Sequence, residues 1–557
     1  MKECIRCKTK FEVDGLDRSF LDKVSPRLDD KKLDIPEPTH CPTCRQIRRL
    51  SHRNERTLYF RECDFNQKKF LSHYSPDSDY KVYSPDVWYG DDWDASEYGR
   101  DYDFTKPFFS QFEELFKNVP QLGLNLQKEN ENCQYTNFTT RNKNSYYIFC
   151  ANENEDCHYS TYLHHCKDVA DCFFVFNCER CYECIDCYNC YNTTYSNYCT
   201  NCNDSHYLVN CKGLNDCIGC VSLANKEYHI FNKAYSKKEY LKLKEDLLLK
   251  PELIKSELEK LLTTTPQKYY AGLQNENITG DHISYSRNVF DSFDCTNLED
   301  CRYCTWLHDS KDCQDCYAWG SRGELGYENH LCGNNFYRVI FSDTCWNDVS
   351  NLIYCRQCIG NCKYLFGCVG MKKKEFCILN KQYTEQEYHQ LVPKIIEHMK
   401  DTKEWGEFFP TELSPFGYNE TVAEEYFPKE KSEVLDNCWK WQDNFPESYG
   451  KETISIDDIP DEPSQYLPSL SREVLSCSCC GKNYRLTSAE IKLYKELGIK
   501  IPSKCFDCRY EGRRIKRNQR KLVERSCDSC SKTLLSSFKQ NDPRKVYCEE
   551  CYLAHVY

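Results

Sequence analysis

The alternation of apolar and polar residues divides the chain into a strand-forming middle and more polar ends. Short aromatic and β-branched runs recur in the middle, among them residues 146–149 (YYIF) and 173–176 (FFVF). Runs of this length and composition are typical of short β-strands. The pattern therefore predicts a mainly β, multi-domain fold with short helices.

Cysteines add a strict period to this region. Between residues 157 and 220 there are thirteen cysteines, and every spacing among them is a multiple of three. Four of them, Cys157, Cys178, Cys199 and Cys220, recur every 21 residues. A fixed period near 20 residues is typical of repeat architectures. The sequence predicts a cysteine-stacked parallel β-helix, or β-solenoid, with coils of about 21 residues and small side chains stacked inward.

A second cysteine-rich block covers residues 295–377, and its cysteines are spaced less regularly. Residues 219–235 match residues 367–383 at a constant offset of 148 residues, which indicates an internal duplication. We therefore expect solenoid blocks at 126–235 and 266–383. The sequence leaves open whether they form one interrupted solenoid or two.

A capping box follows each block and predicts a helix. In Ser236-x-x-Glu239 and Thr384-x-x-Glu387, the first side chain can accept from the third helical N–H while the glutamate reaches back. The predicted helices cover residues 237–261 and 385–400.

Three roles are open for the cysteines of these blocks. They can form a stacked, inert interior, because cysteine behaves as a small hydrophobe and is often buried. They can instead form a thiolate ladder that holds further zinc or another soft metal, or serve a redox or disulfide role. Buried thiols in apolar surroundings are unreactive, which favours the inert interior.

Paired Cys-x-x-Cys knuckles near both ends predict three zinc ribbons. The segment between the two knuckles of a set covers 8–40 in the first, 481–504 in the second and 531–547 in the third. Four thiolates with no open position make a structural zinc site, so we expect about three structural zinc ions. The predicted ligands are Cys4, Cys7, Cys41 and Cys44; Cys477, Cys480, Cys505 and Cys508; and Cys527, Cys530, Cys548 and Cys551.

The second ribbon also contains a predicted helix. Thr487-x-x-Glu490 forms a capping box, and Gly498 is placed to end the helix, which would cover residues 488–497. A helix this short is not stable alone, so we expect the metal to fix it.

The two ends of the chain are related by an ungapped duplication. Residues 41–84 match residues 505–548 at 17 of 44 positions. The N-terminal copy keeps Cys63, but its other three ligand positions are changed. They hold Asn66, Ser84 and Val87. We therefore expect no zinc in this copy.

Charge gathers beside the ribbons. The chain has 74 basic and 86 acidic residues and a net charge of −12, which argues against bulk adhesion to nucleic acid or an anionic membrane. Arginines nevertheless cluster directly after the ribbons, and arginine binds phosphate through paired hydrogen bonds. Ribbons with basic tails predict binding to RNA or DNA; the alternative is a linker face with intramolecular carboxylate partners. The candidate residues are Arg45, Arg49, Arg53, Arg509, Arg513, Arg514, Arg517 and Arg520.

Several classes of protein are disfavoured. No run of 18 apolar residues is present, and the first ten residues lack the apolar core of a signal peptide, so we expect a cytoplasmic protein. We find no Walker loop, Gly-x-Ser-x-Gly, His-Glu-x-x-His or Gly-x-Gly-x-x-Gly motif, which disfavours an enzyme. Acidic residues between Asp91 and Asp103 are expected to form a charged loop that meets the basic patches.

The second ribbon carries a family resemblance. Its pattern, Cys477-x-x-Cys480-Gly481 through Cys505-x-x-Cys508-Arg509, resembles the bacterial domain family called probable zinc ribbon, over residues 477–515. The segments DDWD at 91–94 and WGEFFP at 405–410 are similar to those of cysteine-rich multi-zinc-ribbon proteins of ultra-small uncultivated bacteria. That resemblance implies zinc binding and implies no particular activity.

Together these features predict a domain order and a function. The predicted domains are a zinc ribbon (1–50), a degenerate ribbon copy with an aromatic and acidic segment (51–125), a solenoid block (126–235), a helix (236–265), a second solenoid block (266–383), a helix and a Pro-rich acidic linker (384–476), and two zinc ribbons (477–515 and 516–557). The favoured function is a zinc-binding, non-enzymatic scaffold whose ribbons and arginines bind nucleic acid, RNA or a ribonucleoprotein. The alternatives are a protein-interaction scaffold that uses the solenoid face, and an enzyme acting on that face. No membrane partner is expected.

Overall fold

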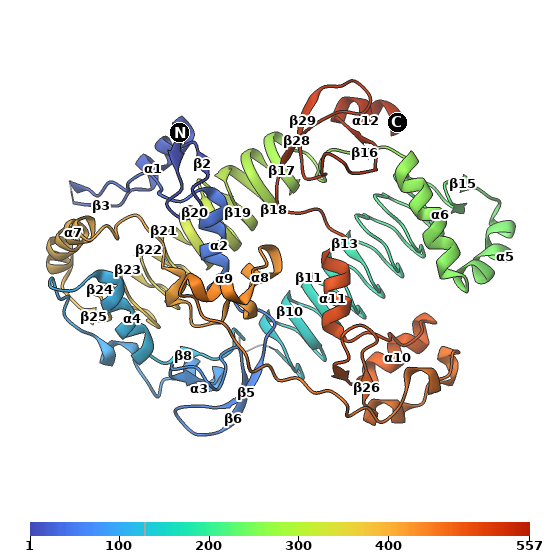
Figure 1. Ribbon diagram of the computed structural model, residues 1–557. Helices are drawn as coiled ribbons and strands as arrows, with labels where there is room; N and C mark the ends of the chain where they lie inside the picture. Colours follow the sequence, from blue (N-terminus) through green and yellow to red (C-terminus); the bar gives the residue numbers. More distant parts are fainter. Residues whose placement is uncertain (30, 127–129, 557) are drawn as a thin grey trace. The chain divides into compact units, whose positions relative to one another are not determined.

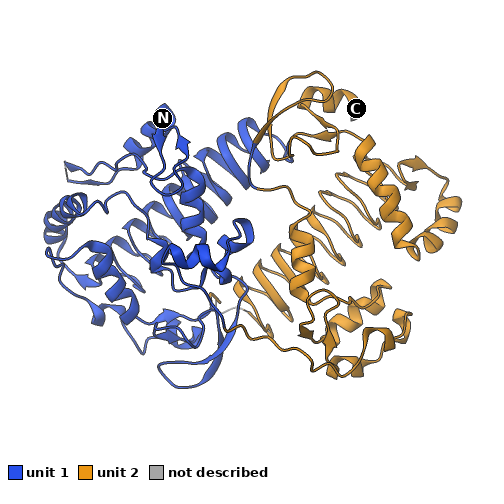
Figure 2. Cartoon of the chain, viewed as in Figure 1, with its two compact units in different colours: residues 1–124, 270–443, 520–522 blue, residues 125–269, 444–519, 523–557 orange. Residues whose placement is uncertain are grey.

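The chain forms two compact units, each assembled from segments that are distant in sequence (Figure 2). The computed structural model describes residues 1–29, 31–126 and 130–556. The other residues, 30, 127–129 and 557, belong to the predicted domains 1–50, 126–235 and 516–557 and lie outside the described part. Unit 1 comprises residues 1–124, 270–443 and 520–522, and unit 2 comprises 125–269, 444–519 and 523–557. The expected multi-domain, strand-rich organisation is confirmed, with cysteine clusters near both ends.

Unit 2 contains a stack of short parallel strands (Figure 1), here called the unit 2 stack. Phe149 lies beside Thr161, and Thr161 beside Phe173, so neighbouring coils are offset by twelve positions. Isolated parallel bridges continue the same offset as far as Ile230. The strands are β9 (Asn137–Thr140), β10 (Tyr146–Asn152), β11 (His158–His164), β12 (Phe173–Phe176) and β13 (Ile185–Tyr188).

A three-residue unit builds each coil. From Asn132 to Phe231 every third residue has a left-handed φ, and the residue that follows it is commonly buried in the stack. Four triplets make one 12-residue coil, so cysteines spaced by multiples of three fall on inward positions. The predicted coil length, which is the spacing from Cys157 to Cys178, is wrong, because that spacing equals one coil plus three further triplets. Successive cysteines at this spacing therefore lie in neighbouring inward-facing columns of the stack.

The inward thiols satisfy backbone groups at the corners. Cys172 Sγ donates to the carbonyl of Ala170 at 3.3 Å and accepts from Cys184 N at 3.3 Å. Ser160 does the same one coil earlier: its Oγ donates to the carbonyl of His158 at 2.7 Å and accepts from Cys172 N at 2.9 Å. Small side chains that both donate and accept are favoured here, because a buried unpaired backbone group is costly.

The predicted buried role of the stack cysteines is confirmed. Those between residues 157 and 220 are buried and belong to one apolar cluster with Ile148, Leu163 and Val175. Among the described residues, close groups of three or more metal-ligating side chains occur in the ribbons and not in the stacks.

Unit 1 contains a second parallel stack, here called the unit 1 stack. Phe293 pairs with Thr305, twelve positions later, whereas Tyr337 pairs with Ser350, thirteen positions later. The strands are β17 (Glu276–Ser284), β18 (Arg287–Arg302), β19 (Thr305–Lys311), β20 (Gln314–Cys332), β21 (Tyr337–Ile340), β22 (Ser350–Ile353), β23 (Lys363–Phe366), β24 (Glu375–Ile378) and an antiparallel β25 (Lys381–Gln382).

Helices follow the last coil of each stack. Both predicted capping boxes form, at Ser236 with Glu239 and at Thr384 with Glu387. Helix α7 (Glu385–Asp401) agrees with its prediction. The single helix predicted at 237–261 is wrong: α5 (Lys237–Leu248) ends and α6 (Pro251–Thr264) begins at Pro251, because proline lacks the N–H that a continuous helix needs.

The remaining elements surround the stacks. Unit 1 adds β1 (Lys2–Glu3), β2 (Lys10–Phe11), α1 (Gly15–Val24), β3 (Arg27–Leu28), β4 (Lys31–Lys32), α2 (Pro42–Leu50), β5 (Tyr59–Glu62), β6 (Lys69–Ser72), β7 (Val82–Tyr83), α3 (Pro85–Tyr89), η1 (Ala95–Tyr98), α4 (Phe108–Asn118), β8 (Gln121–Leu122), η2 (Thr411–Leu413), η3 (Tyr418–Glu420), α8 (Val422–Tyr426) and α9 (Lys431–Asp436). Unit 2 adds β14 (His229–Ile230), β15 (Lys233–Ala234), β16 (Gln267–Lys268), η4 (Ile456–Asp458), η5 (Pro463–Gln465), η6 (Pro468–Arg472), β26 (Leu475–Ser476), β27 (Asn483–Tyr484), α10 (Ser488–Leu497), α11 (Phe506–Arg514), β28 (Val523–Ser526), β29 (Thr533–Ser536), β30 (Val546–Tyr547) and α12 (Glu549–Val556).

Candidate metal centres and arginine clamps

The predicted cysteine sets come together as three groups of four. Within each group all four Sγ atoms lie within 4.8 Å of one another, so each group could hold a metal ion. One group is in unit 1 and two are in unit 2. The groups are Cys4, Cys7, Cys41 and Cys44; Cys477, Cys480, Cys505 and Cys508; and Cys527, Cys530, Cys548 and Cys551.

Each group joins a hairpin turn to a helix start. The first knuckle lies between two short antiparallel strands, β1–β2, β26–β27 or β28–β29, and the second lies at the start of α2, α11 or α12. In the second group, Cys477 N donates to the carbonyl of Lys482 at 3.0 Å, and Gly481, with φ of 73°, turns the chain. The third group repeats this turn, since Cys527 N donates to the carbonyl of Lys532 at 2.8 Å.

Backbone N–H groups favour the thiolate of one cysteine in each of the second and third groups. Cys505 N donates to Cys477 Sγ, and Cys548 N donates to Cys527 Sγ, both at 3.2 Å. Burial opposes ionisation of Cys477, but the backbone N–H bonds outweigh it and lower the pKa of this thiol to about 6. The same balance lowers the pKa of Cys527 to about 6. Thiolates are the form that binds metal, so the donor set fits a soft or borderline cation.

The helix predicted inside the second ribbon is confirmed. Helix α10 covers Ser488–Leu497, with the capping box of Thr487 and Glu490 formed and Gly498 in the left-handed conformation at its end. Its buried face includes Ile491, and Tyr494 OH donates to Glu490 at 2.7 Å.

The N-terminal copy of the third ribbon has a single thiol. Cys63 is fully buried, and both the backbone N and the Oγ of Ser84 contact its sulfur, at 3.4 and 3.7 Å. Val87 is buried beside it in an apolar cluster. Of the three positions that carry the other ligands in the C-terminal copy, one thus holds the hydroxyl of Ser84, one the apolar side chain of Val87 and one the amide of Asn66.

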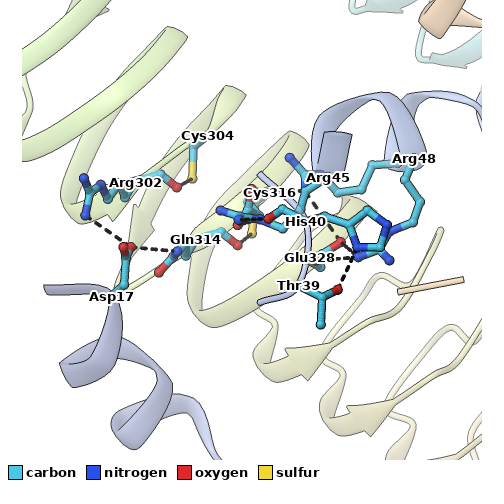
Figure 3. A network of polar contacts seen from close by, with 12 residues as sticks. Asp17, Thr39, His40, Arg45, Arg48, Arg302, Cys304, Gln314, Cys316 and Glu328 are labelled. Carbon is cyan, nitrogen blue, oxygen red and sulfur yellow. Dashed lines mark hydrogen bonds and ion pairs between the residues drawn. The ribbon is translucent and has the colours of Figure 1, made fainter. Parts of the chain in front are cut away.

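In unit 1 the arginines after the first ribbon enter the interior. Arg45 Nε donates to Asp315 at 2.8 Å, and Arg49 lies 3.1 Å from the other oxygen of the same carboxylate. Both arginines are 2% exposed, and Asp315 is 0% exposed. Figure 3 shows Arg45 and Arg48 extending from α2, with Arg48 paired to Glu328 at 2.8 Å. Helix α2 is thereby fixed to the unit 1 stack.

A second contact holds the preceding helix α1 to the same stack. Asp17, on α1, accepts from Arg302 at 3.2 Å and from Gln314 at 3.1 Å (Figure 3). Figure 3 also shows Cys304 and Cys316, whose thiols donate to the carbonyls two residues before them.

Arg53 lies beyond the end of α2 and is also buried. It pairs with Glu55, and its guanidinium lies 3.1 Å from His330 Nε2. Its side chain is fully buried, so it forms part of the unit 1 interior.

In unit 2 the arginines after the second ribbon make the matching contact. Arg509 Nη1 donates to Asp171 at 2.7 Å, and Arg513 Nη1 lies 2.9 Å from the other carboxylate oxygen. Arg513 also donates to Glu183 at 2.6 Å. Arg517 follows with a two-bond contact to Asp186, at 2.8 and 2.9 Å.

These contacts define one motif, here called the arginine clamp, that occurs in both units. It consists of a helix that starts at a knuckle, two arginines four residues apart, and one fully buried aspartate of the stack. Asp171 and Asp315 lie 144 residues apart, and each directly precedes an inward cysteine. A tyrosine ring faces the first guanidinium in each case, at 4.8 Å from Tyr159 to Arg509 and at 5.2 Å from Tyr303 to Arg45.

The two aspartates were not predicted from the sequence. No local signal singles them out in the sequence, because Asp-Cys dipeptides recur through both blocks, for example at 156–157, 186–187, 294–295 and 312–313. Their fully buried carboxylates require a charged partner, and the arginine helix supplies two.

All eight predicted arginines form ion pairs with carboxylates of the chain. Arg514 pairs with Glu511 of its own helix at 2.7 Å, and Arg520 pairs with Asp294 at 2.8 Å. Among the eight arginines, Arg514 has the most exposed side chain, with an exposed fraction of 21%. The arrangement agrees with the alternative of intramolecular carboxylate partners, while nucleic-acid binding by these residues stays a prediction.

The acidic segment meets lysines and not the arginine clusters. Asp94 pairs with Lys374 at 2.9 Å, and Asp101 pairs with Lys381 at 2.6 Å. Both lysines belong to the last turns of the unit 1 stack, so this segment covers its end.

Comparisons with known proteins leave the family open. No protein-family model matches the chain, and no curated protein matches it. Among solved structures, one match is a protein of Desulfovibrio desulfuricans G20 that is provisionally assigned as an acetyltransferase. It is 8% identical, the match covers 42% of this chain and 65% of that one, and the TM-score of 0.10 is too low to carry an argument.

The expected groups of zinc-ribbon type are therefore confirmed only as cysteine clusters, and the resemblance to multi-ribbon bacterial proteins stays a prediction. Within the described ranges, no helix has both the length and the apolar character needed to cross a bilayer.

Proposed function

We propose that this protein is a zinc-stapled, non-enzymatic scaffold in which both stacks are β-solenoids. The observation that carries the proposal is the arginine clamp, which couples a four-cysteine group to a buried aspartate of the stack in each unit. Four thiolates leave no open position for a substrate, so the role we assign to the metal is structural.

The 12-residue parallel offset supports the solenoid assignment. Each coil places its inward side chains above those of the preceding coil, and the same backbone pairing continues from coil to coil. Such an array is stabilised mainly by contacts between neighbours, and its lateral faces offer extended surfaces to partners. We therefore propose a protein partner on a stack face.

Zinc explains how short helices can organise long stacks. Helix α11 has nine residues, and α2 also has nine, which is below the length at which isolated helices are stable in water. Zinc bound at the helix start would order the helix. Its arginines would then already be in place to pair with the aspartate. A reducing compartment, the cytoplasm, suits a chain in which none of the 42 cysteines, all of them among the described residues, forms a disulfide.

Metal analysis of reduced, purified protein tests this proposal. We expect about three zinc ions per chain, and about two in Cys505→Ser, because one closed site loses a ligand. Cys181→Ser, in the unit 2 stack, is the matched control and should leave the zinc content unchanged. Less than one zinc per chain, or a loss of zinc in the control, would contradict the assignment.

A further inference from the structure

We infer that the arginine segment of unit 2, residues 509–517, is a latent nucleic-acid-binding element that is released when the second ribbon loses its metal. The inference rests on the proposed zinc site and adds a regulated activity to it. It is carried by the position of the arginines, which lie between the metal group and the stack.

The segment is directly attached to the metal group. Cys505, one of the four clustered thiols, is the N-cap residue of helix α11, and Arg509 follows Cys508 without a spacer. The two knuckle cysteines therefore lie at the N-cap and in the first turn of the short helix that carries the clamp. Any change at the cysteine group is transmitted to Arg509 and Arg513 within one or two helical turns.

In the clamped state the positive charges are engaged. Arg509 and Arg513 share the carboxylate of Asp171, and Arg517 holds Asp186 through two bonds. The side chains of these three arginines are 5%, 1% and 7% exposed. A phosphate could reach them only after the helix leaves the stack.

Metal loss removes what orders the helix. A nine-residue helix is unstable alone, and structural zinc contributes folding free energy to such modules. Once α11 unfolds, water replaces arginine around Asp171 and Asp186, so neither carboxylate is left buried without a partner. The ion pairs then become ordinary exposed pairs, which are weak and are screened by salt.

The released segment has the chemistry of a phosphate ligand. It carries five positive charges in nine residues against one carboxylate, Glu511. The cationic side chains are Arg509, Arg513, Arg514, Lys516 and Arg517. Arginine forks fit phosphate oxygens in pairs, and a flexible basic segment can follow a nucleic-acid backbone. We therefore assign the partner as a nucleic-acid backbone, read without sequence preference.

The test measures RNA binding by the full-length reduced chain with and without metal. The probe is a fluorescein-labelled 20-nucleotide poly(U) RNA, followed by anisotropy at 50 mM salt. We expect weak binding by zinc-loaded protein and at least about tenfold tighter binding after chelation. With five phosphate contacts, the affinity of the metal-free form should fall about 10²–10³-fold between 50 and 200 mM salt.

Two variants identify the segment. Replacing Arg513, Arg514 and Arg517 with Gln should return the metal-free affinity to that of the zinc-loaded chain. The matched control removes three charges from α5, by replacing Lys237, Lys238 and Lys242 with Gln, and should leave the gain intact. Equal loss in both variants would overturn the assignment to residues 509–517.

A third variant separates the clamp from the metal. Asp171→Asn removes the carboxylate that both arginines share but leaves all four cysteines in place, so RNA binding should rise in the zinc-loaded protein. Unchanged binding in this variant, or after chelation that demonstrably removes zinc, overturns the inference while the zinc proposal stands. Absence of zinc from the starting protein would instead overturn the proposal on which it rests. Poly-glutamate that competes as well as RNA at equal charge would exclude the nucleic-acid assignment.

Discussion

The C-terminal ribbon and its N-terminal copy share a backbone framework but differ in what holds it together. Residues 523–548 form β28, β29 and β30 around a four-cysteine group, whereas residues 59–84 form β5, β6 and β7 around one cysteine. The comparison shows which parts of the module depend on metal and which do not.

The shared framework is a set of matching hydrogen bonds. Val82 N donates to Asp64, and Val546 N donates to Asp528, both at 2.7 Å. A nearby arginine, Arg61 or Arg525, also donates to each aspartate, at 3.1 and 3.0 Å respectively. In each copy the third strand pairs in parallel with a distant strand, β8 for the first copy and β16 for the second.

The copies differ in the size of their apolar surroundings. The N-terminal copy packs Cys63 and Val87 with Trp88, Leu122 and other aromatic side chains. The C-terminal copy has a small cluster formed by Cys527, Leu534 and Cys548. Burial of a large aromatic side chain contributes several kcal/mol, which is enough to fix a short hairpin without metal. A hydrophobic core and a metal are thus alternative means of fixing one framework.

The largest effect is expected from removing a ligand in the metal-dependent copy. Cys527→Ser should unfold residues 523–556 locally and release one metal, because structural zinc contributes about 10 kcal/mol or more to such modules. Hydrogen exchange and metal analysis would show both changes. The matched substitution Cys63→Ser should cost about 1 kcal/mol and release no metal; equal effects at both sites would refute the distinction.

The metal-independent copy should lose stability when its aromatic core is removed. Trp88→Ala should destabilise unit 1 by about 3–5 kcal/mol, because the indole is fully buried and its Nε1 donates to Pro120 O. The equivalent residue of the other copy is Tyr552, which is half-buried and bonds Asn210. Tyr552→Ala should cost about 1 kcal/mol in a chemical denaturation curve. A larger loss of stability in Tyr552→Ala than in Trp88→Ala would contradict the view that the aromatic core matters more in the metal-independent copy.

The arginine clamp is the feature that both ends keep, so breaking it should have similar effects in both units. Asp171→Asn and Asp315→Asn each leave two buried arginines without their shared carboxylate and should cost about 3 kcal/mol. Thermal unfolding with two resolved transitions would show one unit affected by each variant. A cost near zero in either unit would mean that the clamp is not a stabilising contact there.

The smallest expected change in stability comes from rebuilding the missing ligands. Replacing Asn66, Ser84 and Val87 together with Cys should add about one zinc per chain, because Cys63 and the matching hydrogen-bond framework are already in place. In the metal-free protein, stability should fall by only about 1 kcal/mol, since the change removes the valine methyls from a buried cluster. Zinc content is the measurement, and an unchanged count would mean that the backbone of this copy no longer fits a metal.

Much of the candidate site was predictable because it is local. The knuckle spacing determined the three cysteine groups, and the capping boxes determined where α5, α7 and α10 begin. The three-residue period of the cysteines determined that they share inward columns. These features depend on residues a few positions apart, where backbone geometry leaves few choices.

The coil length and the fate of the arginines were decided by tertiary structure. A period of three is compatible with a coil of four triplets or of seven, and only the strand pairing, which places Thr161 beside Phe173, selects four. Arg509 lies 338 residues from Asp171, and Arg45 lies 270 residues from Asp315. A basic cluster in the sequence has the same composition whether it meets phosphate or a buried carboxylate. The partner is set by burial, since a desolvated aspartate binds the nearest guanidinium that the fold presents.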